Sequence, residues 1–136
     1  MLVVNRDIRT ATARHVRWGD LPIEAKAFRV AHGVYSIVGL GSLATIWWSA
    51  ASRRRNRLVR GSVVFLLAEG AALISGKGNC PFGPFQASLG DPVPFFELIL
   101  RPRAAKAAIP ILAAASIAGL GAMAVRPPIP ARSKGA

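Results

Sequence analysis

The chain has 136 residues, of which 52% are hydrophobic and 18% are charged, with 18 Lys and Arg against 6 Asp and Glu. This length provides one domain, and the charges cluster between long uncharged runs, which is typical of a small multi-pass membrane protein. The net charge of +12 does not indicate a nucleic-acid partner, because the basic residues lie at the ends of apolar runs, where they would meet lipid head groups.

The first predicted span follows a basic tail, residues 1–20, which has no apolar run of signal-peptide length. Residues 21–29 have the pattern of a helix start, and they lead into 30–52, a run of 23 residues without a formal charge. A membrane-spanning helix needs about 20 residues. Two tryptophans near the end of this run, Trp47 and Trp48, suit the lipid–water interface. We therefore predict a first span at 30–52.

A second and a third span follow the first. Five arginines lie between residues 53 and 60, and that segment is only long enough for a turn between antiparallel helices. The next apolar run predicts a second span at 58–76, and the uncharged run 107–125 predicts a third. We expect a single membrane domain over 21–126, followed by a proline-rich tail, 127–136.

The connection between the second and third spans, residues 77–106, is rich in proline, glycine and phenylalanine. Asp91 followed by Pro92 has the pattern of a helix N-cap, and the apolar residues 95–100 are too few to cross a bilayer. We predict one short amphipathic helix here, lying on the membrane surface or re-entering it. The expected fold class is all-α, with three transmembrane helices and this short helix.

The charge distribution gives two answers about orientation. The arginine density at 53–60 favours a cytoplasmic turn, which would place the 77–106 connection outside. The total number of Lys and Arg residues favours the opposite, because eight would lie on the cytoplasmic side and ten on the other. We favour the first orientation, with the N-terminus outside.

Glu69 is the one acidic residue within a predicted span. Burying a charge in lipid is costly, so an ionisable residue there marks either a functional site or a packing device. Counting along antiparallel helices places Glu69 level with Ser42 on the first span and near Ser116 on the third. A polar cluster of these three side chains would serve helix packing or proton and ion handling.

His32 lies near the start of the first span and, by the same counting, level with Cys80, the only cysteine. A histidine beside a cysteine can form a reactive thiolate or half of a metal site. No third ligand accompanies this pair, and a single cysteine excludes an internal disulfide and a multi-thiolate metal site. We expect an interfacial histidine and an inert thiol, with no catalytic residue, metal or cofactor.

Two features suit contact with another protein. Small residues recur every four positions on the later spans, as in Ala114, Ala118 and Ala122, and such faces let helices approach closely. The 77–106 connection adds a second set of residues. These predicted contact residues are Pro81, Phe82, Pro84, Phe85, Asp91, Phe95 and Phe96.

The stretch from Cys80 to Gln86, Cys-Pro-Phe-Gly-Pro-Phe-Gln, resembles the Cys-Pro-Leu-Thr-Pro-Leu-Glu motif of a family of small bacterial membrane proteins of unknown function. In that family a histidine on the first span and an acid on the second precede the motif, and His32 and Glu69 stand at comparable places. The continuation, residues 90–97, resembles that of actinobacterial membrane proteins. Here phenylalanines replace the leucines, Gln86 replaces the acid, and Glu69 lies further from the cysteine. The resemblance implies a bacterial membrane location and no particular activity.

Two functions stay open at this point. The first is an accessory or interaction subunit of a larger complex in the bacterial plasma membrane, with the lipid bilayer and another membrane protein as partners. The alternative is a membrane carrier or an enzyme-like protein that uses Glu69, His32 and Cys80 for proton, metal or thiol chemistry. We favour the first, because no catalytic constellation stands out in the sequence.

Overall fold

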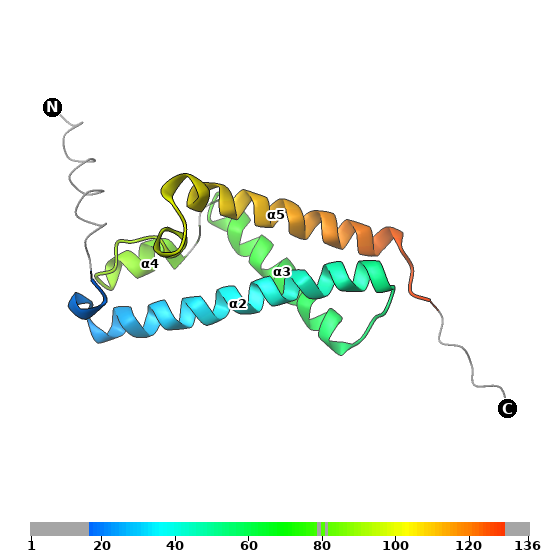
Figure 1. Ribbon diagram of the computed structural model, residues 1–136, viewed down its shortest axis with the longest axis horizontal. Helices are drawn as coiled ribbons and strands as arrows, with labels where there is room; N and C mark the ends of the chain where they lie inside the picture. The colour runs from blue at the N-terminus through cyan, green and yellow to red at the C-terminus, as the bar shows by residue number, and fades with distance from the viewer. Residues whose placement is uncertain (1–16, 79, 81, 130–136) are drawn as a thin grey trace. The chain divides into compact units, whose positions relative to one another are not determined.

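The computed structural model describes residues 17–78, 80 and 82–129, and their regular structure is helical (Figure 1). No strand forms within these residues. In chain order the elements are η1 (Trp18–Asp20), α2 (Ile23–Ser52), α3 (Arg57–Ser75), α4 (Phe82–Ser88), η2 (Phe95–Leu98) and α5 (Pro102–Val125), where η denotes a 3-10 helix. Three of them, α2, α3 and α5, are long and apolar enough to cross a membrane. This confirms the predicted all-α fold with three transmembrane helices.

Two of the long helices start earlier than the predicted spans. Helix α2 begins at Ile23, within the helix start predicted at 21–29, whereas α5 begins at Pro102 and not at residue 107. The prediction counted uncharged residues only, whereas a helix continues into the polar interface, where long basic side chains are tolerated. Pro102 suits the first helical position, because a proline lacks the N–H that would be unpaired there. Most of the predicted tails, residues 1–16 and 130–136, lies outside the described residues.

The described residues divide into two compact units. Unit one contains the chain up to Tyr35 together with Ala72–Ile109. Unit two contains Ser36–Ala71 and the chain from Pro110 onward. Unit one thus holds the connection between α3 and α5, and unit two holds the arginine turn between α2 and α3.

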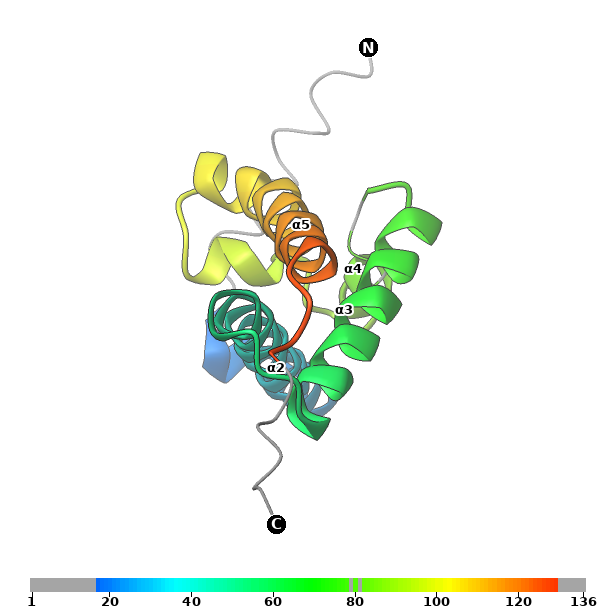
Figure 2. The ribbon, with the colours of Figure 1, turned by 90° about the vertical axis from the view of Figure 1, so that its right-hand side faces the viewer.

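Unit two is built by direct packing of three helical segments, drawn in teal, green and orange in Figure 2. Its buried core consists of Ile46 from α2 with Val59 and Leu66 from α3, and side chains of α5 pack against them. Gly119 permits the close approach of α5, because a Cβ there would lie 3.0 Å from a methyl group of Ile46. Small residues serve helix packing in lipid in this way.

The arginine turn of unit two is held by one of its own arginines. The guanidinium of Arg55 donates to the carbonyl and hydroxyl oxygens of Ser49, at 3.2 and 2.6 Å. It also donates to the carbonyl oxygens of Met123 at 2.7 Å and Arg126 at 3.1 Å. Helix ends leave carbonyls without intrahelical partners, and a cation there is favourable. Arg55 therefore binds the C-terminal ends of α2 and α5 together.

Unit one contains more helix in the 77–106 connection than the sequence predicts. The segment after Cys80 forms α4 despite its glycine and proline, because proline is tolerated in the first turn of a helix. The predicted N-cap at Asp91 is wrong. The 3-10 helix η2 begins at Phe95 after Pro94, without a side-chain cap, and Asp91 has a different set of partners.

Candidate functional site

A buried carboxylate is the centre of unit one. Asp91 is 1% exposed and accepts two hydrogen bonds from the guanidinium of Arg29 in α2, from Nε at 2.8 Å and from Nη2 at 2.5 Å. Its oxygens also accept from the Gln86 amide nitrogen at 2.9 Å and from the Val93 backbone nitrogen at 3.3 Å. Four donors to one carboxylate compensate for the water that it loses on burial.

Gln86 extends this network along the connection. It is 3% exposed, and its amide nitrogen donates to the carbonyl oxygen of Val93 at 2.7 Å as well as to Asp91. A carboxylate at position 86 would place two like charges side by side, whereas the amide group donates to the acid. This explains physically why an amide suits position 86 in this chain.

The local backbone positions Asp91 for this pairing. Gly90 has φ +86°, a left-handed conformation that other residues adopt only with strain, and the Asp91 nitrogen donates to the carbonyl oxygen of Gln86 at 3.2 Å. The Arg29 guanidinium also lies 5.9 Å from the centre of the Trp18 ring, within cation–π range. The irregular connection is thus fixed to α2 by polar side chains.

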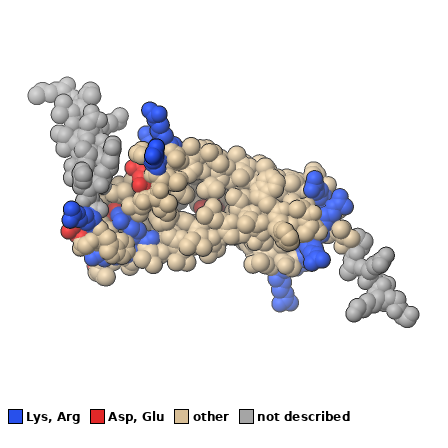
Figure 3. All heavy atoms as spheres, viewed as in Figure 1, with Lys and Arg blue, Asp and Glu red and all other residues tan. Residues whose placement is uncertain are grey.

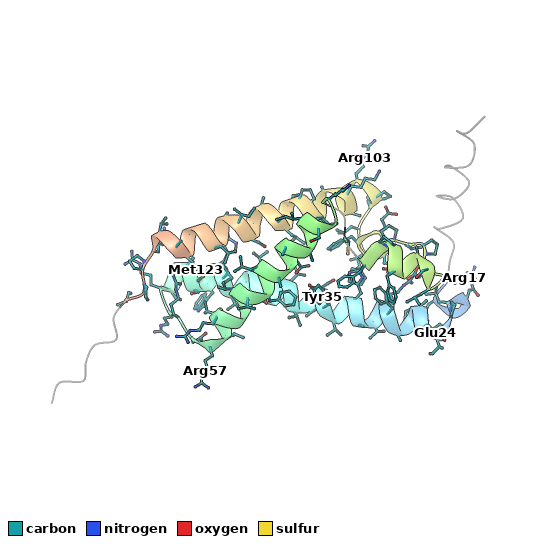
Figure 4. All side chains as sticks on the ribbon, turned by 180° about the vertical axis from the view of Figure 1, so that it is seen from behind. Arg17, Glu24, Tyr35, Arg57, Arg103 and Met123 are labelled. Atoms are coloured by element: carbon teal, nitrogen blue, oxygen red, sulfur yellow. The ribbon has the colours of Figure 1, made fainter. Side chains whose placement is uncertain are left out.

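Unit one also contains a cluster of aromatic rings. Phe28 of α2 makes edge contacts with Phe82 at 6.3 Å and with Phe85 at 5.2 Å between ring centres. The His32 ring stacks on Phe95 at 4.8 Å. Tyr35, labelled in Figure 4, meets Phe82 at 5.7 Å. Such pairs contribute about 0.5–1.5 kcal/mol each beyond the burial of their area.

A small apolar cavity of about 170 Å³ opens among these rings. It is lined by Phe28, Ala31, His32, Tyr35 and Phe82. The Cys80 sulfur lies 4.0 Å from Nε2 of His32, and the Gln86 side chain also interacts with the imidazole. Within the described residues no group of three or more His, Cys, Asp and Glu side chains is placed to hold a metal ion.

The predicted polar cluster around Glu69 belongs to unit two. A Glu69 carboxyl oxygen lies 3.4 Å from the position that a Cβ on Gly39 would take, so α2 leaves room for the acid. Ser42 is buried, and the Ser116 hydroxyl donates to the carbonyl oxygen of Leu112 in its own helix at 2.9 Å. The hydrogen bonds among the described residues do not link Glu69 to either serine. A shared role for these three residues stays a prediction.

The predicted contact residues of the connection lie in different environments. Three of them, Phe82, Pro84 and Phe85, are exposed on α4. Asp91 is buried in the network and is not accessible to another protein. Phe95 and Phe96 are partly buried and contact each other, with ring centres 5.9 Å apart. Pro81 lies outside the described residues.

Asp91 was among the predicted contact residues, but the residues that pair with it were not predicted. Arg29 and Gln86 carry the network, and Arg55 has a similar role in unit two. One signal was available in the sequence. An acid within an apolar connection of a membrane protein needs a cationic partner, and Arg29 is one of only two basic residues between 18 and 52.

Comparisons with known protein families, curated proteins and solved structures found no match to this chain. The resemblance of residues 80–86 to a bacterial membrane family therefore stays a prediction. The functional assignment therefore rests on the contacts within each unit and on the three helices that are suited to cross a membrane.

Proposed function

We propose that this protein is an accessory subunit of the bacterial plasma membrane that docks onto a larger membrane complex through the folded connection between α3 and α5. The observation that carries the proposal is the difference in exposure between polar and aromatic side chains of that connection. Two of its polar side chains, Asp91 and Gln86, are buried, while Phe82 is 38% exposed and Phe85 is 54% exposed. The buried polar pair holds the connection, and these two aromatic side chains of α4 keep accessible surface for a partner.

The cost of this arrangement supports a recognition role. Burying an ion pair requires removing two charges from water, which good geometry only compensates. The pair fixes the connection to α2, so the exposed aromatic side chains of α4 have defined positions. A fixed set of exposed aromatic side chains is what protein interfaces use as anchors, because rigid aromatics lose little entropy on binding.

The spans also leave much of their surface uncovered. Only 6 to 17% of the most apolar window of each long helix is buried within the chain. On α5, Ala114 and Ala118 are exposed, and small side chains let a neighbouring helix approach closely. Lipid or the helices of another protein can therefore cover these faces.

The docking proposal is tested by purification from native membranes in a mild detergent. We expect a heteromeric partner in a fixed ratio with the natural chain, and its loss when Phe82 and Phe85 are both replaced by Ala. A matched control is Ile74→Ala on α3, because Ile74 is 81% exposed but lies outside the connection. Recovery of this protein alone, or equal partner loss with the control, would contradict the proposal.

The proposed location is tested by fractionation of bacterial cells. The spans predict that the protein stays in the inner-membrane pellet after washing with alkaline carbonate and with high salt. Release by salt alone would indicate a basic peripheral protein and would contradict the transmembrane assignment.

A second candidate function is favoured by one contact. The Cys80 sulfur and the His32 ring are adjacent at the edge of an apolar cavity, an arrangement that thiol or metal chemistry uses. Glu69, the third residue of that alternative, belongs to unit two. A metal, haem or quinone that co-purifies with the natural protein but not with Cys80→Ser would support this second function over docking.

A further inference from the structure

A second cavity lies in unit two, at the arginine turn. Its volume is about 460 Å³, and it lies between the end of α2 and the start of α3. Its lining includes Thr45 and Trp48 from α2, Arg54 and Asn56 from the turn, and Leu58 from α3. The proposed docking role does not involve this cavity.

The surroundings of this cavity are cationic. Five arginines occupy residues 53–60, and the sequence has no acidic residue between Glu24 and Glu69. Arg55 is engaged with helix carbonyls, but Arg53, Arg54, Arg57 and Arg60 are all exposed. Figure 3 shows these basic atoms in blue where α2 ends and α3 begins. The positive end of the α3 dipole adds to the same field.

Some polar groups of the cavity already have hydrogen-bond partners within the chain, and others can bind a ligand. The Ser49 hydroxyl donates to the Arg54 carbonyl oxygen at 2.7 Å and accepts from Arg55, so it is satisfied within the chain. The Asn56 side-chain oxygen accepts from the Val59 nitrogen at 2.9 Å, which leaves its amide hydrogens for a ligand. Arg54 is the only charged residue in the lining.

The rim of the cavity is apolar and exposed. Trp48 is 73% exposed and Leu58 is 66% exposed, although both are large hydrophobic side chains. Tryptophan at the end of a spanning helix lies at the level of the lipid head groups. A ligand that fits both parts of this cavity has a negatively charged head and an apolar body.

We propose that this cavity binds the phosphate-bearing head group of an anionic phospholipid. Arg54 and the Asn56 amide bind the phosphate, and Trp48 and Leu58 contact the glycerol and the first methylene groups. Basic pockets between transmembrane helices bind anionic lipid head groups for these reasons. A zwitterionic lipid would gain less, because its own cation would face the arginines.

The test measures lipid selectivity of the purified full chain in a neutral detergent. Pyrene-labelled phosphatidylglycerol or phosphatidylcholine is titrated in, and energy transfer to pyrene from the tryptophans, of which Trp47 and Trp48 lie near the end of α2, reports binding. We expect the natural chain to prefer phosphatidylglycerol by about five-fold or more, since each basic residue near anionic lipid contributes about that factor. Equal transfer with both lipids would overturn the proposal.

Three variants locate the binding. Arg54→Gln should remove most of the preference, and Arg54→Lys should keep most of it. Arg60→Gln is the matched control, because Arg60 is exposed in the same basic cluster but does not line the cavity; it should lose clearly less of the preference than Arg54→Gln does. Equal losses in Arg54→Gln and Arg60→Gln, at unchanged helical content by circular dichroism, would indicate a diffuse charged surface and overturn the proposal.

Inorganic phosphate separates a lipid head group from a soluble anion. Millimolar phosphate should not displace the pyrene lipid, because a free anion gains nothing from Trp48 and Leu58. Displacement at that concentration would assign the cavity to a soluble anion and overturn the lipid proposal.

Discussion

The two units of this chain are stabilised in different ways. Unit two is three helical segments in direct contact, with Ile46 and Leu66 in its core and Gly119 at a close approach. Unit one contains an irregular connection, and a buried network of Arg29, Asp91 and Gln86 joins it to α2. Each unit thus has its own main source of stability.

The difference follows from the backbone. A helix satisfies its own N–H and C=O groups, so helical segments in a membrane need only close packing and small residues. An irregular segment near a membrane must find partners for its polar groups, and side chains within the protein supply them. Gln86, which donates to the Val93 carbonyl oxygen, shows this directly. Substitutions in each unit test this difference in the source of stability.

The largest effect is expected from Asp91→Ala in unit one. Removing one partner of a buried pair leaves Arg29 uncompensated and should lower the free energy of unfolding by about 3–5 kcal/mol. Unfolding in mixed micelles of mild and denaturing detergent measures this loss. Asp20→Ala is the control, because Asp20 is exposed and should change stability by less than about 0.5 kcal/mol. A loss below 1 kcal/mol for Asp91→Ala, on the order of an exposed substitution, would remove the distinction between the units.

In unit two the corresponding test is overpacking. Gly119→Leu must displace Ile46 and the Trp47 ring, whose nitrogen lies 3.2 Å from the position of a Cβ. We expect a loss of about 1–3 kcal/mol in the same micelle assay. Gly121→Leu is the matched control two residues away, because no atom lies within 4 Å of its Cβ position. Equal effects of the two substitutions would mean that α5 does not pack through Gly119.

A comparable effect is expected at the arginine turn. Arg55→Met removes the donors to the carbonyls of Ser49, Met123 and Arg126. It should lower the free energy of unfolding by about 1.5–3 kcal/mol, less the part that water restores by binding the same carbonyls. Arg57→Met, at an exposed arginine of the same turn, should be nearly neutral. Arg57 and Met123 are labelled in Figure 4. Protease cleavage at the turn should increase for Arg55→Met only, and cleavage in both variants would contradict the assigned role.

The smallest effects are expected at Glu69. If the acid serves packing beside Gly39, Glu69→Gln should be nearly silent and Glu69→Leu should lose about 1 kcal/mol or less. Micelle stability and a cellular phenotype are measured for both variants. A stable Glu69→Gln protein without function would show that the acid handles protons or ions instead.

The sequence predicted the parts of the fold that depend on local properties. Length and apolarity locate α2, α3 and α5, because a bilayer requires about 20 apolar residues of helix. Counting along antiparallel helices also suggested that His32 and Cys80 are level, since each residue of a helix advances about 1.5 Å. The two side chains are adjacent in unit one.

The contacts that fix unit one could not be predicted in the same way. Arg29 and Asp91 are 62 residues apart, and no local pattern relates them. The proline and glycine of α4 indicate a loop when they are considered alone, and packing on Phe28 makes a helix of that segment. Asp91 before a proline has an N-cap pattern, but the nearby guanidinium is a stronger partner than a helix N-terminus.

The most direct test of the contrast is a double-mutant cycle on Arg29 and Asp91. Arg29→Met and Asp91→Leu are compared singly and together in the micelle unfolding assay. Each single variant should lose about 3–5 kcal/mol, and the double variant should lose clearly less than the sum of the two, because no uncompensated charge stays buried, although Gln86 and the Val93 nitrogen still lack their acceptor. A double variant whose loss equals the sum of the two single losses would contradict the claim that this pair holds unit one together.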